Sequence, residues 1–383
     1  MKIIKRLIIA VASIGIIIGV TTLALYLNAV ITGNNYAQKN IEYQNNHLEK
    51  LKNEYYTDDY TPCDEEAITA FDLAKAYADG VKLNEVTFIG THNSYQLLAT
   101  KQKRIYSEFV EAITFGHEKD KKLYFEMDTL TTQLDNGVRN LEIDIEAEVD
   151  GDKVDFIVFH HHPLDNVSSC YNFEKALEEI ALWSDNNPGH LPVSILVEPK
   201  NIEKEKNGIK EFSLTYADEL DAAVRRALGD KLVTPADMLG DYESFKAMRA
   251  DDGWATLEEM RGKVILLLHP CDAIEDYISI NTSIKTQAIF PMLRPEDAER
   301  DCASFILDNE PEEAAVNNKV NADALRLIVR TRADNYPTFS DERYAAADKC
   351  GSHIITTDYP SRTVRPDDHT YTFGGYTVKM RGN

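Results

Sequence analysis

From about residue 83 onward, short apolar runs alternate with longer amphipathic segments. Seven runs have the character of buried strands: EVTFIG, VRNLEIDIE, DFIVFH, PVSILVE, KVILLLH, LRLIVRT and HIITTD. Helix-like segments such as YNFEKALEEIALWSD and SLTYADELDAAVRRAL lie between several of them. Strands that alternate with helices predict a parallel sheet. Seven or more strands within roughly 290 residues favour a closed (β/α)8 TIM barrel, which typically takes about 250 residues. A doubly wound open sheet is the alternative.

The N-terminus has the pattern of a membrane anchor. Lys2, Lys5 and Arg6 precede an apolar stretch that runs from Leu7 to about Ile31. This stretch is long enough to cross a hydrocarbon core, which needs about 20 residues. A cleaved signal peptide is the alternative, but the sequence has no clear small-residue cleavage site. Because positive charge stays on the cytoplasmic side, we expect a transmembrane helix with the rest of the chain outside the cytoplasm, or a secreted protein if this segment is cleaved.

Changes of composition divide the chain into four expected parts. Residues 1–31 would form the transmembrane helix. Residues 32–81 are polar and contain helix formers with only a thin apolar stripe, so we interpret them as a partly helical stalk. Residues 82–362 would form the barrel, and residues 363–383 a C-terminal tail.

Composition limits the possible partners. The formal net charge is −23. This argues against nucleic acid, whose phosphates bind patches of Lys and Arg, and against binding to anionic lipid by charge alone. None of the five cysteines stands in a CxxC pair, so we expect no thiolate zinc site. A disulfide is allowed outside the cytoplasm, but the sequence gives neither its pairing nor the oligomeric state.

Acidic side chains near the strand ends predict a metal site. In a parallel barrel, the carboxyl ends of the strands form one rim, where active sites lie. In NLEIDIE, strand alternation places Glu142, Asp144 and Glu146 on one face. Carboxylates crowded inside a barrel repel one another unless a cation binds, and oxygen ligands select Ca²⁺ or Mg²⁺. Glu198 and the amide oxygen of Asn93 can complete this set. The alternative is a solvated edge strand with an acidic outer face.

Histidines near the same rim predict acid–base chemistry. The segment IGTHNSYQ presents His92 in a tight loop after a strand. FHHHPLD contains three consecutive histidines, and strand parity places His160 and His162 on one face and His161 on the other. One imidazole of this run opposite His92 would form a pair that passes protons near neutral pH. A surface loop or a transition-metal site is the alternative for the triple histidine.

With Lys200 and Arg332 as nearby cations, these features describe a site for a phosphate diester. The sequence resembles the calcium-dependent phosphatidylinositol-specific phospholipase C family of secreted bacterial and fungal type, in the wider group of phospholipase C-like phosphodiesterases. The motifs that carry the resemblance, in chain order, are LNEVTFIGTHNSY, LTTQLDNGVRNLEIDI, VFHHHPLDNVSSC, WSDNNPGHLPVSILVEPK, TLEEMRGKVILLL, IVRTRAD and HIITTDYP. They span residues 82–362. The resemblance implies a distorted TIM barrel that cleaves a phosphodiester with Ca²⁺.

The resemblance also implies roles for individual residues. The implied calcium ligands are Asn93, Glu142, Asp144 and Glu198, and Lys200 and Arg332 are expected to bind substrate. His92 would be the first catalytic histidine. The family's second histidine stands five residues before an aspartate, which selects His160 before Asp165. More distant eukaryotic relatives use a Y-H-x-H pattern, which would select His162. A substrate hydroxyl would attack phosphorus, and His92 would assist that attack or stabilise the charge of the pentacoordinate phosphorus. His160 would protonate the departing alcohol, and the product would be a cyclic phosphate.

We therefore expect a calcium-dependent phosphodiesterase of the phospholipase C type. Its substrate would be phosphatidylinositol or a related phosphodiester, taken as a membrane lipid or as a soluble headgroup. A glycerophosphodiester phosphodiesterase is the nearest enzymatic alternative. A non-catalytic, membrane-tethered binding protein is the alternative outside enzymes. The sequence departs from the family pattern in its triple histidine and in WATLEEM, which lacks the proline that usually follows the tryptophan.

Overall fold

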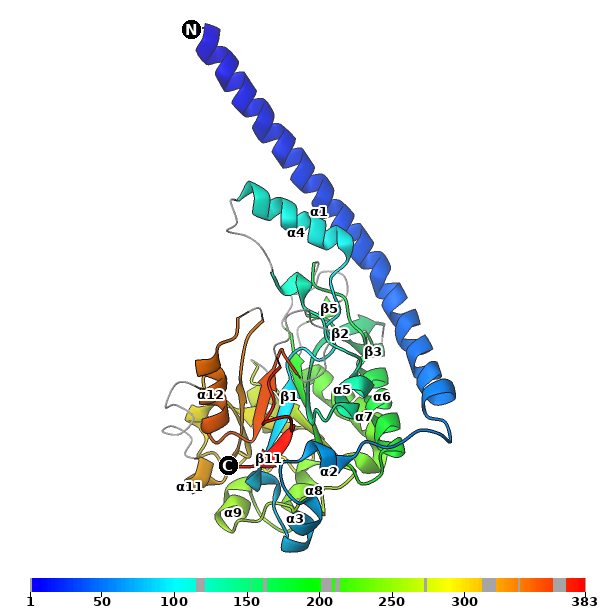
Figure 1. Ribbon diagram of the computed structural model, residues 1–383, viewed down its shortest axis with the longest axis vertical. Coiled ribbons are helices and arrows are strands. Elements are labelled where there is room, and N and C mark those ends of the chain that lie inside the picture. Colours follow the sequence, from blue (N-terminus) through cyan, green and yellow to red (C-terminus); the bar gives the residue numbers. More distant parts are fainter. Residues whose placement is uncertain are drawn as a thin grey trace.

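Figure 1 shows a barrel from which one long helix projects. The structure is a computed structural model of the 383-residue chain. It describes residues 2–114, 121–151, 153–160, 164–200, 209–210, 214–271, 274–311, 322–336, 338–360 and 370–382.

Eight parallel strands close into the barrel. Around the ring they are β1 (Val86–Thr91), β2 (Asn140–Asp150), β4 (Val193–Pro199), β6 (Val264–Leu268), β7 (Phe290–Leu293), β8 (Phe305–Leu307), β9 (Ile328–Arg332) and β10 (Ile354–Thr357). β10 pairs with β1, so the ring is complete and the open-sheet alternative is excluded. The predicted barrel is confirmed. Outside the ring, β11 (Val378–Met380) pairs antiparallel with β1, so part of the segment that we expected to be a tail joins the sheet.

The ring closes at a narrow seam between β1 and β2. One ladder pair, Gly90 with Asn140, joins these two strands, with one backbone hydrogen bond on each side of it (Arg139 N to Ile89 O and Ser94 N to Glu142 O). By contrast, β2 and β4 pair along residues 140–145 of β2. A Cβ atom at residue 90 would lie 2.6 Å from Asn140 Oδ1. Glycine therefore permits the close approach of the two strands, and the short seam distorts the barrel.

The sequence-based strand prediction is wrong at two places. The run DFIVFH does not enter the parallel ring, because β3 (Lys153–Ile157) pairs antiparallel with the far end of β2. β5 (Ile209–Lys210) pairs with the same part of β2. Conversely, β7 and β8 were not predicted. They are four and three residues long, and Pro291 lies within β7, so neither leaves an extended apolar signal.

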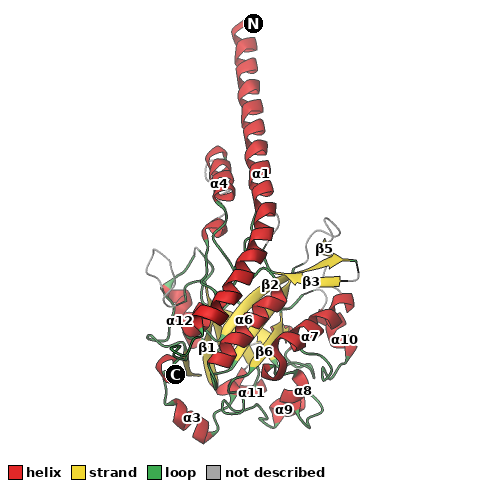
Figure 2. Ribbon diagram, turned by 90° about the vertical axis from the view of Figure 1, so that its right-hand side faces the viewer, coloured by secondary structure: helices red, strands yellow, loops and turns green. Residues whose placement is uncertain are grey.

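Helices surround the barrel, as Figure 2 shows. They are α2 (Glu65–Ile68), α3 (Leu73–Asp79), α5 (Leu130–Asp135), α6 (Phe173–Asn186), α7 (Leu214–Leu228), α8 (Pro235–Leu239), α9 (Phe245–Ala250), α10 (Ile274–Ile280), α11 (Ala322–Leu325) and α12 (Asp341–Lys349). The start of α6 follows from its sequence, because the side chain of Asn172 accepts a hydrogen bond from Lys175 N and caps the first turn. Phe173, Leu177 and Ile180 recur at helical spacing and are fully buried in the core.

α1 (Lys2–Lys50) is one continuous helix. Its residues Ile3–Gly33 are long and apolar enough to cross a membrane. The helix continues without a break into the residues that we assigned to the stalk, and there its side chains bond to α6. α4 (Lys101–Ile113), which belongs to the connection after β1, lies beside α1 in both views (Figures 1 and 2).

Candidate active site

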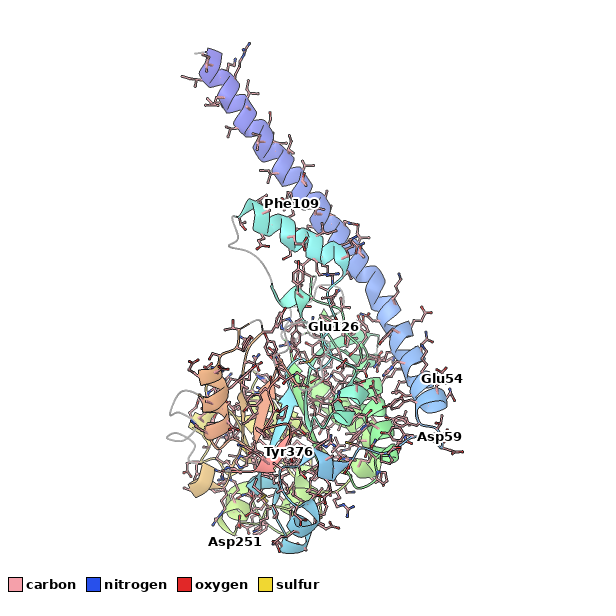
Figure 3. The ribbon with its side chains drawn as sticks, in the orientation of Figure 1. Glu54, Asp59, Phe109, Glu126, Asp251 and Tyr376 are labelled. Atoms are coloured by element: carbon pink, nitrogen blue, oxygen red, sulfur yellow. The ribbon has the colours of Figure 1, made fainter. Side chains whose placement is uncertain are left out.

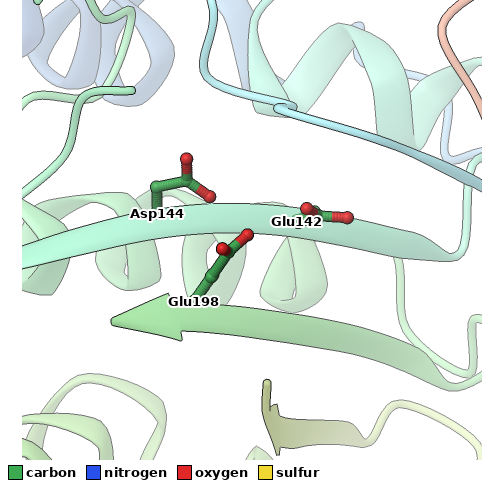
Figure 4. A group of neighbouring side chains, drawn as sticks. All are labelled: Glu142, Asp144 and Glu198. Atoms are coloured by element: carbon green, nitrogen blue, oxygen red, sulfur yellow. The ribbon is translucent and has the colours of Figure 1, made fainter. Parts of the chain in front are cut away.

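Three acidic side chains meet across the neighbouring strands β2 and β4. Glu142 and Asp144 occupy alternate positions of β2, and Glu198 lies opposite Asp144 in the register with β4. Figure 4 shows their carboxylates together. One oxygen from each lies within 4.8 Å of the other two. Strand alternation, read from the sequence, predicted Glu142 and Asp144 on one face, and the structure has them in one cluster.

Asn93 stands beside this carboxylate cluster. It follows β1 with a φ of 49°, a left-handed conformation that asparagine tolerates. The hydroxyl of Tyr95 donates a hydrogen bond to Asp144 Oδ2 at 2.7 Å and lies 3.5 Å from Asn93 Oδ1. The structure thus brings the four predicted ligands together. Tyr95, which is fully buried, was not predicted, because nothing in the local sequence shows that its ring turns back toward β2.

Two cations, the buried Arg330 and the half-buried Lys200, lie against the carboxylates. Arg330 on β9 forms an ion pair with Glu142. Lys200 Nζ lies 3.0 Å from Asp144 Oδ2 and 2.8 Å from Glu198 Oε1. Lys200, which we expected to contact substrate, therefore contacts two of the predicted metal ligands in this structure.

The carboxylates differ in their protonation. Burial raises the pKa of Asp144 to about 7, because the nearby Lys200 charge does not offset the loss of water. Burial also opposes ionisation of Glu142, but the Arg330 charge outweighs it and lowers the pKa of Glu142 to about 2. Burial raises the pKa of Glu146, the next inward position on β2, to about 8.

This donor set suits a hard divalent cation. Asp144 Oδ1 is buried and has no hydrogen-bond partner among the described residues. An orphaned carboxylate oxygen is costly in a protein interior, and a cation would remove that cost. Calcium takes six to eight oxygen ligands from carboxylates, amides and water. Three carboxylates and one amide oxygen supply part of such a shell, so the residues fit calcium.

His92 lies between the carboxylate cluster and Asp358. His92 Nδ1 is 2.9 Å from Asp358 Oδ1, and His92 Nε2 is 3.8 Å from Glu142 Oε1. In the tautomer in which Nδ1 donates to the ionised Asp358, Nε2 is the basic atom of the neutral ring. Arg332 Nη2 lies 3.4 Å from Asp358 Oδ2 and 3.1 Å from His92 Nδ1. The predicted substrate cation therefore stands beside the predicted base.

His160 is held by a second aspartate. His160 Nδ1 lies 2.9 Å from Asp165 Oδ2, and Gln96 Nε2 donates to Asp165 Oδ1 at 2.6 Å. Burial alone would lower the pKa of His160, but the hydrogen bond and charge of Asp165 raise it above the usual histidine value. His161 and His162 lie outside the described residues, so the alternative assignment to His162 stays open.

One pocket joins the two histidines. It is lined by His92, Asn93, Gln96, Phe125, His160, Asp165, Asn335, Tyr336 and Asp358. Phe125 and Tyr336, which were not predicted, contact each other with ring centroids 5.4 Å apart. The pocket therefore offers two imidazoles, each bonded to a carboxylate, next to a cluster of metal-binding type.

A family model described as phosphoinositide phospholipase C, Ca²⁺-dependent, matches residues 81–156 and 152–383. The chain belongs to this family. The matched residues cover the whole barrel and begin after α1, so the resemblance seen in the sequence motifs is confirmed. Among curated proteins, none matches the chain.

Solved structures of the family share the fold. A calcium-dependent phosphoinositol-specific phospholipase C from Pseudomonas sp. is 19% identical with a TM-score of 0.55, and the match covers 83% of this chain and 99% of that one. A Ca²⁺-dependent phosphatidylinositol-specific phospholipase C from Streptomyces antibioticus is 20% identical with a TM-score of 0.52, covering 79% of this chain and all of that one. At these identities, the likeness establishes the barrel rather than the substrate.

Proposed function

We propose that the protein is a calcium-dependent phosphodiesterase of the phospholipase C type that cleaves phosphatidylinositol or a related phosphodiester to a cyclic phosphate. The observation that carries the proposal is the pocket that holds both His92 and His160, each with Nδ1 against an aspartate, beside the carboxylate cluster. Family membership supports the reaction class.

The two histidines would divide the proton transfers. Nε2 of His92 takes the proton of a substrate hydroxyl as the hydroxyl oxygen bonds to phosphorus. The bond from phosphorus to the departing alcohol oxygen breaks, and His160 gives that oxygen a proton. The raised pKa of His160 suits it to start as the acid. Asp358 and Asp165 hold the two rings in the required orientation.

Calcium would be held by Asn93, Glu142, Asp144 and Glu198. When bound, it would offset the negative charge that builds up on the phosphate as the attacking hydroxyl oxygen bonds to phosphorus. Arg332, which stands beside His92, would add a second positive charge. Lys200 would hold Asp144 and Glu198 in place.

We also propose that α1 anchors the enzyme in a membrane with the barrel outside the cytoplasm. Lys5 and Arg6 lie at the end of the helix that would stay inside, and Ile3–Gly33 supplies the apolar length. The partners would then be a phosphodiester lipid or its headgroup, and the membrane itself.

The test is an assay of the full chain in detergent with phosphatidylinositol mixed micelles. Phosphorus NMR should detect a cyclic inositol phosphate in calcium and none in EGTA. His92→Ala and His160→Ala should each lose about 100-fold or more of turnover, and His161→Ala serves as the matched control. Wild-type rates in both variants would refute the site, while loss in His162→Ala alone would move the second histidine by two residues.

The same assay separates the glycerophosphodiesterase alternative. The proposed reaction uses the inositol ring hydroxyl adjacent to the phosphate, whereas a glycerophosphodiesterase does not need that ring. Turnover of glycerophosphocholine at the rate of glycerophosphoinositol would favour the alternative.

A further inference from the structure

The anchor helix is rigidly joined to the barrel. Gln44 of α1 is fully buried and exchanges two hydrogen bonds with the backbone of Asn172, at 2.9 and 2.8 Å. Three residues further along α1, His47 Nε2 lies 3.2 Å from Glu179 Oε1 on α6. Buried polar groups that are satisfied in both directions specify one arrangement. These bonds therefore fix the direction of α1 relative to the barrel, which a flexible linker would not do.

The exposed apolar part of α1 has the length of one bilayer crossing. Every side chain of residues 3–20 is exposed. The stretch from Arg6 to Tyr26 rises about 30 Å at 1.5 Å per residue, which matches the hydrocarbon thickness. With Arg6 at one membrane surface, Tyr26 falls at the other, where tyrosine is favoured.

α4 lies at that same level. Its Tyr106 packs on Tyr26 with ring centroids 5.6 Å apart. Ile105, Phe109 and Ile113 recur at a spacing of four on α4, and Ile105 is exposed. Apart from the buried Lys103, the charged residues of α4 form a separate stripe composed of Lys101, Arg104, Glu108 and Glu111. An amphipathic helix of this kind suits the membrane interface, and it continues the apolar surface that α1 exposes.

α4 is also tied to the pocket. Lys103 of α4 is buried and donates to Asn166, the neighbour of the Asp165 that holds His160. A Cβ atom on Gly33 of α1 would come within 3.1 Å of Lys103 Cε and 3.3 Å of Asn166 Oδ1. The anchor, α4 and the loop that carries the second histidine thus meet at one point.

We propose that α1 and α4 form a membrane-docking unit that holds the pocket against the bilayer in which α1 is anchored, so that the enzyme takes its phosphodiester from lipid of that same bilayer. The choice of substrate rests on the proposed function, whereas the docking does not. Figure 3 shows Phe109 on α4, beside the middle of α1, and Asp251 at the opposite end of the barrel.

Docking is tested by tryptophan fluorescence. The full chain carrying Phe109→Trp is reconstituted into phosphatidylcholine vesicles with brominated acyl chains, and Asp251→Trp is the control. The two native tryptophans are buried, with 0% and 3% exposure, and give a constant background. Quenching of the residue-109 signal alone is expected. Equal quenching of both signals, or of neither, would overturn the docking. If Phe109→Trp is not quenched and the protein forms a dimer that Phe109→Glu dissociates, the apolar face of α4 binds a second copy of the chain instead.

The lipid source is tested by comparing three substrates. Reconstituted enzyme should cleave phosphatidylinositol in its own vesicles about tenfold or more faster than in separate vesicles. Phe109→Glu should lose about tenfold of that rate and keep its rate on soluble glycerophosphoinositol, and Glu108→Gln should keep both. Equal rates in own and separate vesicles would overturn the proposal. Absence of cleavage of all three substrates would contradict the proposed function, while the quenching result still reports on docking.

Discussion

Mild acid should destabilise the barrel through His353, a histidine outside the active site. His353 immediately precedes β10 in the chain, and its side chain is buried with 1% exposure. Its Nδ1 accepts a hydrogen bond from Val329 N at 3.0 Å, and its Nε2 donates to the carbonyl of Asn84 at 3.0 Å. The ring is therefore neutral in the fold, and a proton on Nδ1 would face another N–H group. Burial, together with the charge of Arg381, lowers the pKa of His353 to about 3.

The size of the effect follows from proton counting. Between the folded pKa of about 3 and the unfolded value of about 6.5, the unfolded chain binds a proton that the folded chain does not. The free energy of unfolding is therefore undiminished above pH 6.5 and falls as pH decreases below it. At pH 5.0 the two pKa values give a loss of about 2 kcal/mol relative to pH 7.5. A stability of about 5–15 kcal/mol is typical of a folded protein, so this loss is substantial.

Urea unfolding of the full chain in detergent measures this loss. Fluorescence of the buried tryptophans reports the barrel, and calcium is held constant at pH 7.5 and pH 5.0. The matched variant is His353→Gln, whose side chain offers one donor and one acceptor that do not titrate. Its loss between the two pH values should be about 2 kcal/mol smaller than that of the wild type. An identical loss in both proteins would refute the reasoning. His353→Asn repeats the comparison if the glutamine variant does not fold.

Three further predictions concern the barrel and the metal site. Tyr95→Phe removes the hydroxyl that donates a hydrogen bond to Asp144. Half-maximal activity, measured in calcium–EGTA buffers, should then need about 10- to 100-fold more free calcium. An unchanged calcium requirement would contradict the assignment of Asp144 as a ligand. Gly90→Ala places a methyl group in the β1–β2 seam and should lower stability by about 1–3 kcal/mol, measured by urea unfolding, whereas a neutral result would mean that the seam adapts. Arg330→Gln leaves Glu142 buried without its ion pair. The free energy of unfolding should fall by about 3–5 kcal/mol in EGTA, and calcium should restore part of it. Equal losses of stability with and without calcium would count against a metal at Glu142.

The fold could be predicted where strands are long and apolar on both faces. In β6 all five residues are buried, and such a run marks a strand of a parallel barrel without any tertiary information. β8 has only three residues, which is too short to distinguish from a loop. The run that contains β3 has the correct secondary structure, but its antiparallel partner is the far end of β2. Pairing direction depends on tertiary contacts that strand composition does not encode.

The candidate site could be predicted where strand geometry alone determines position. Alternation along β2 was enough to group Glu142 with Asp144, and the rim of a parallel barrel brought Glu198 to them. The contacts of Lys200 could not be predicted, because its partners depend on the β2–β4 register. The same holds for Tyr95, whose ring reaches Asp144 across the interior. Long side chains can reach several neighbours, so sequence indicates their presence at a rim rather than their partners.

The narrow seam between β1 and β2 has a consequence for how the barrel opens locally. His92 follows β1 and Glu142 belongs to β2, so the proposed base and a proposed calcium ligand stand on opposite sides of the join made by Gly90. Regions with few backbone hydrogen bonds open most readily, on timescales that amide hydrogen exchange detects. We expect amide hydrogen exchange to be fastest at this join, and calcium bound across it to slow the opening of the ring.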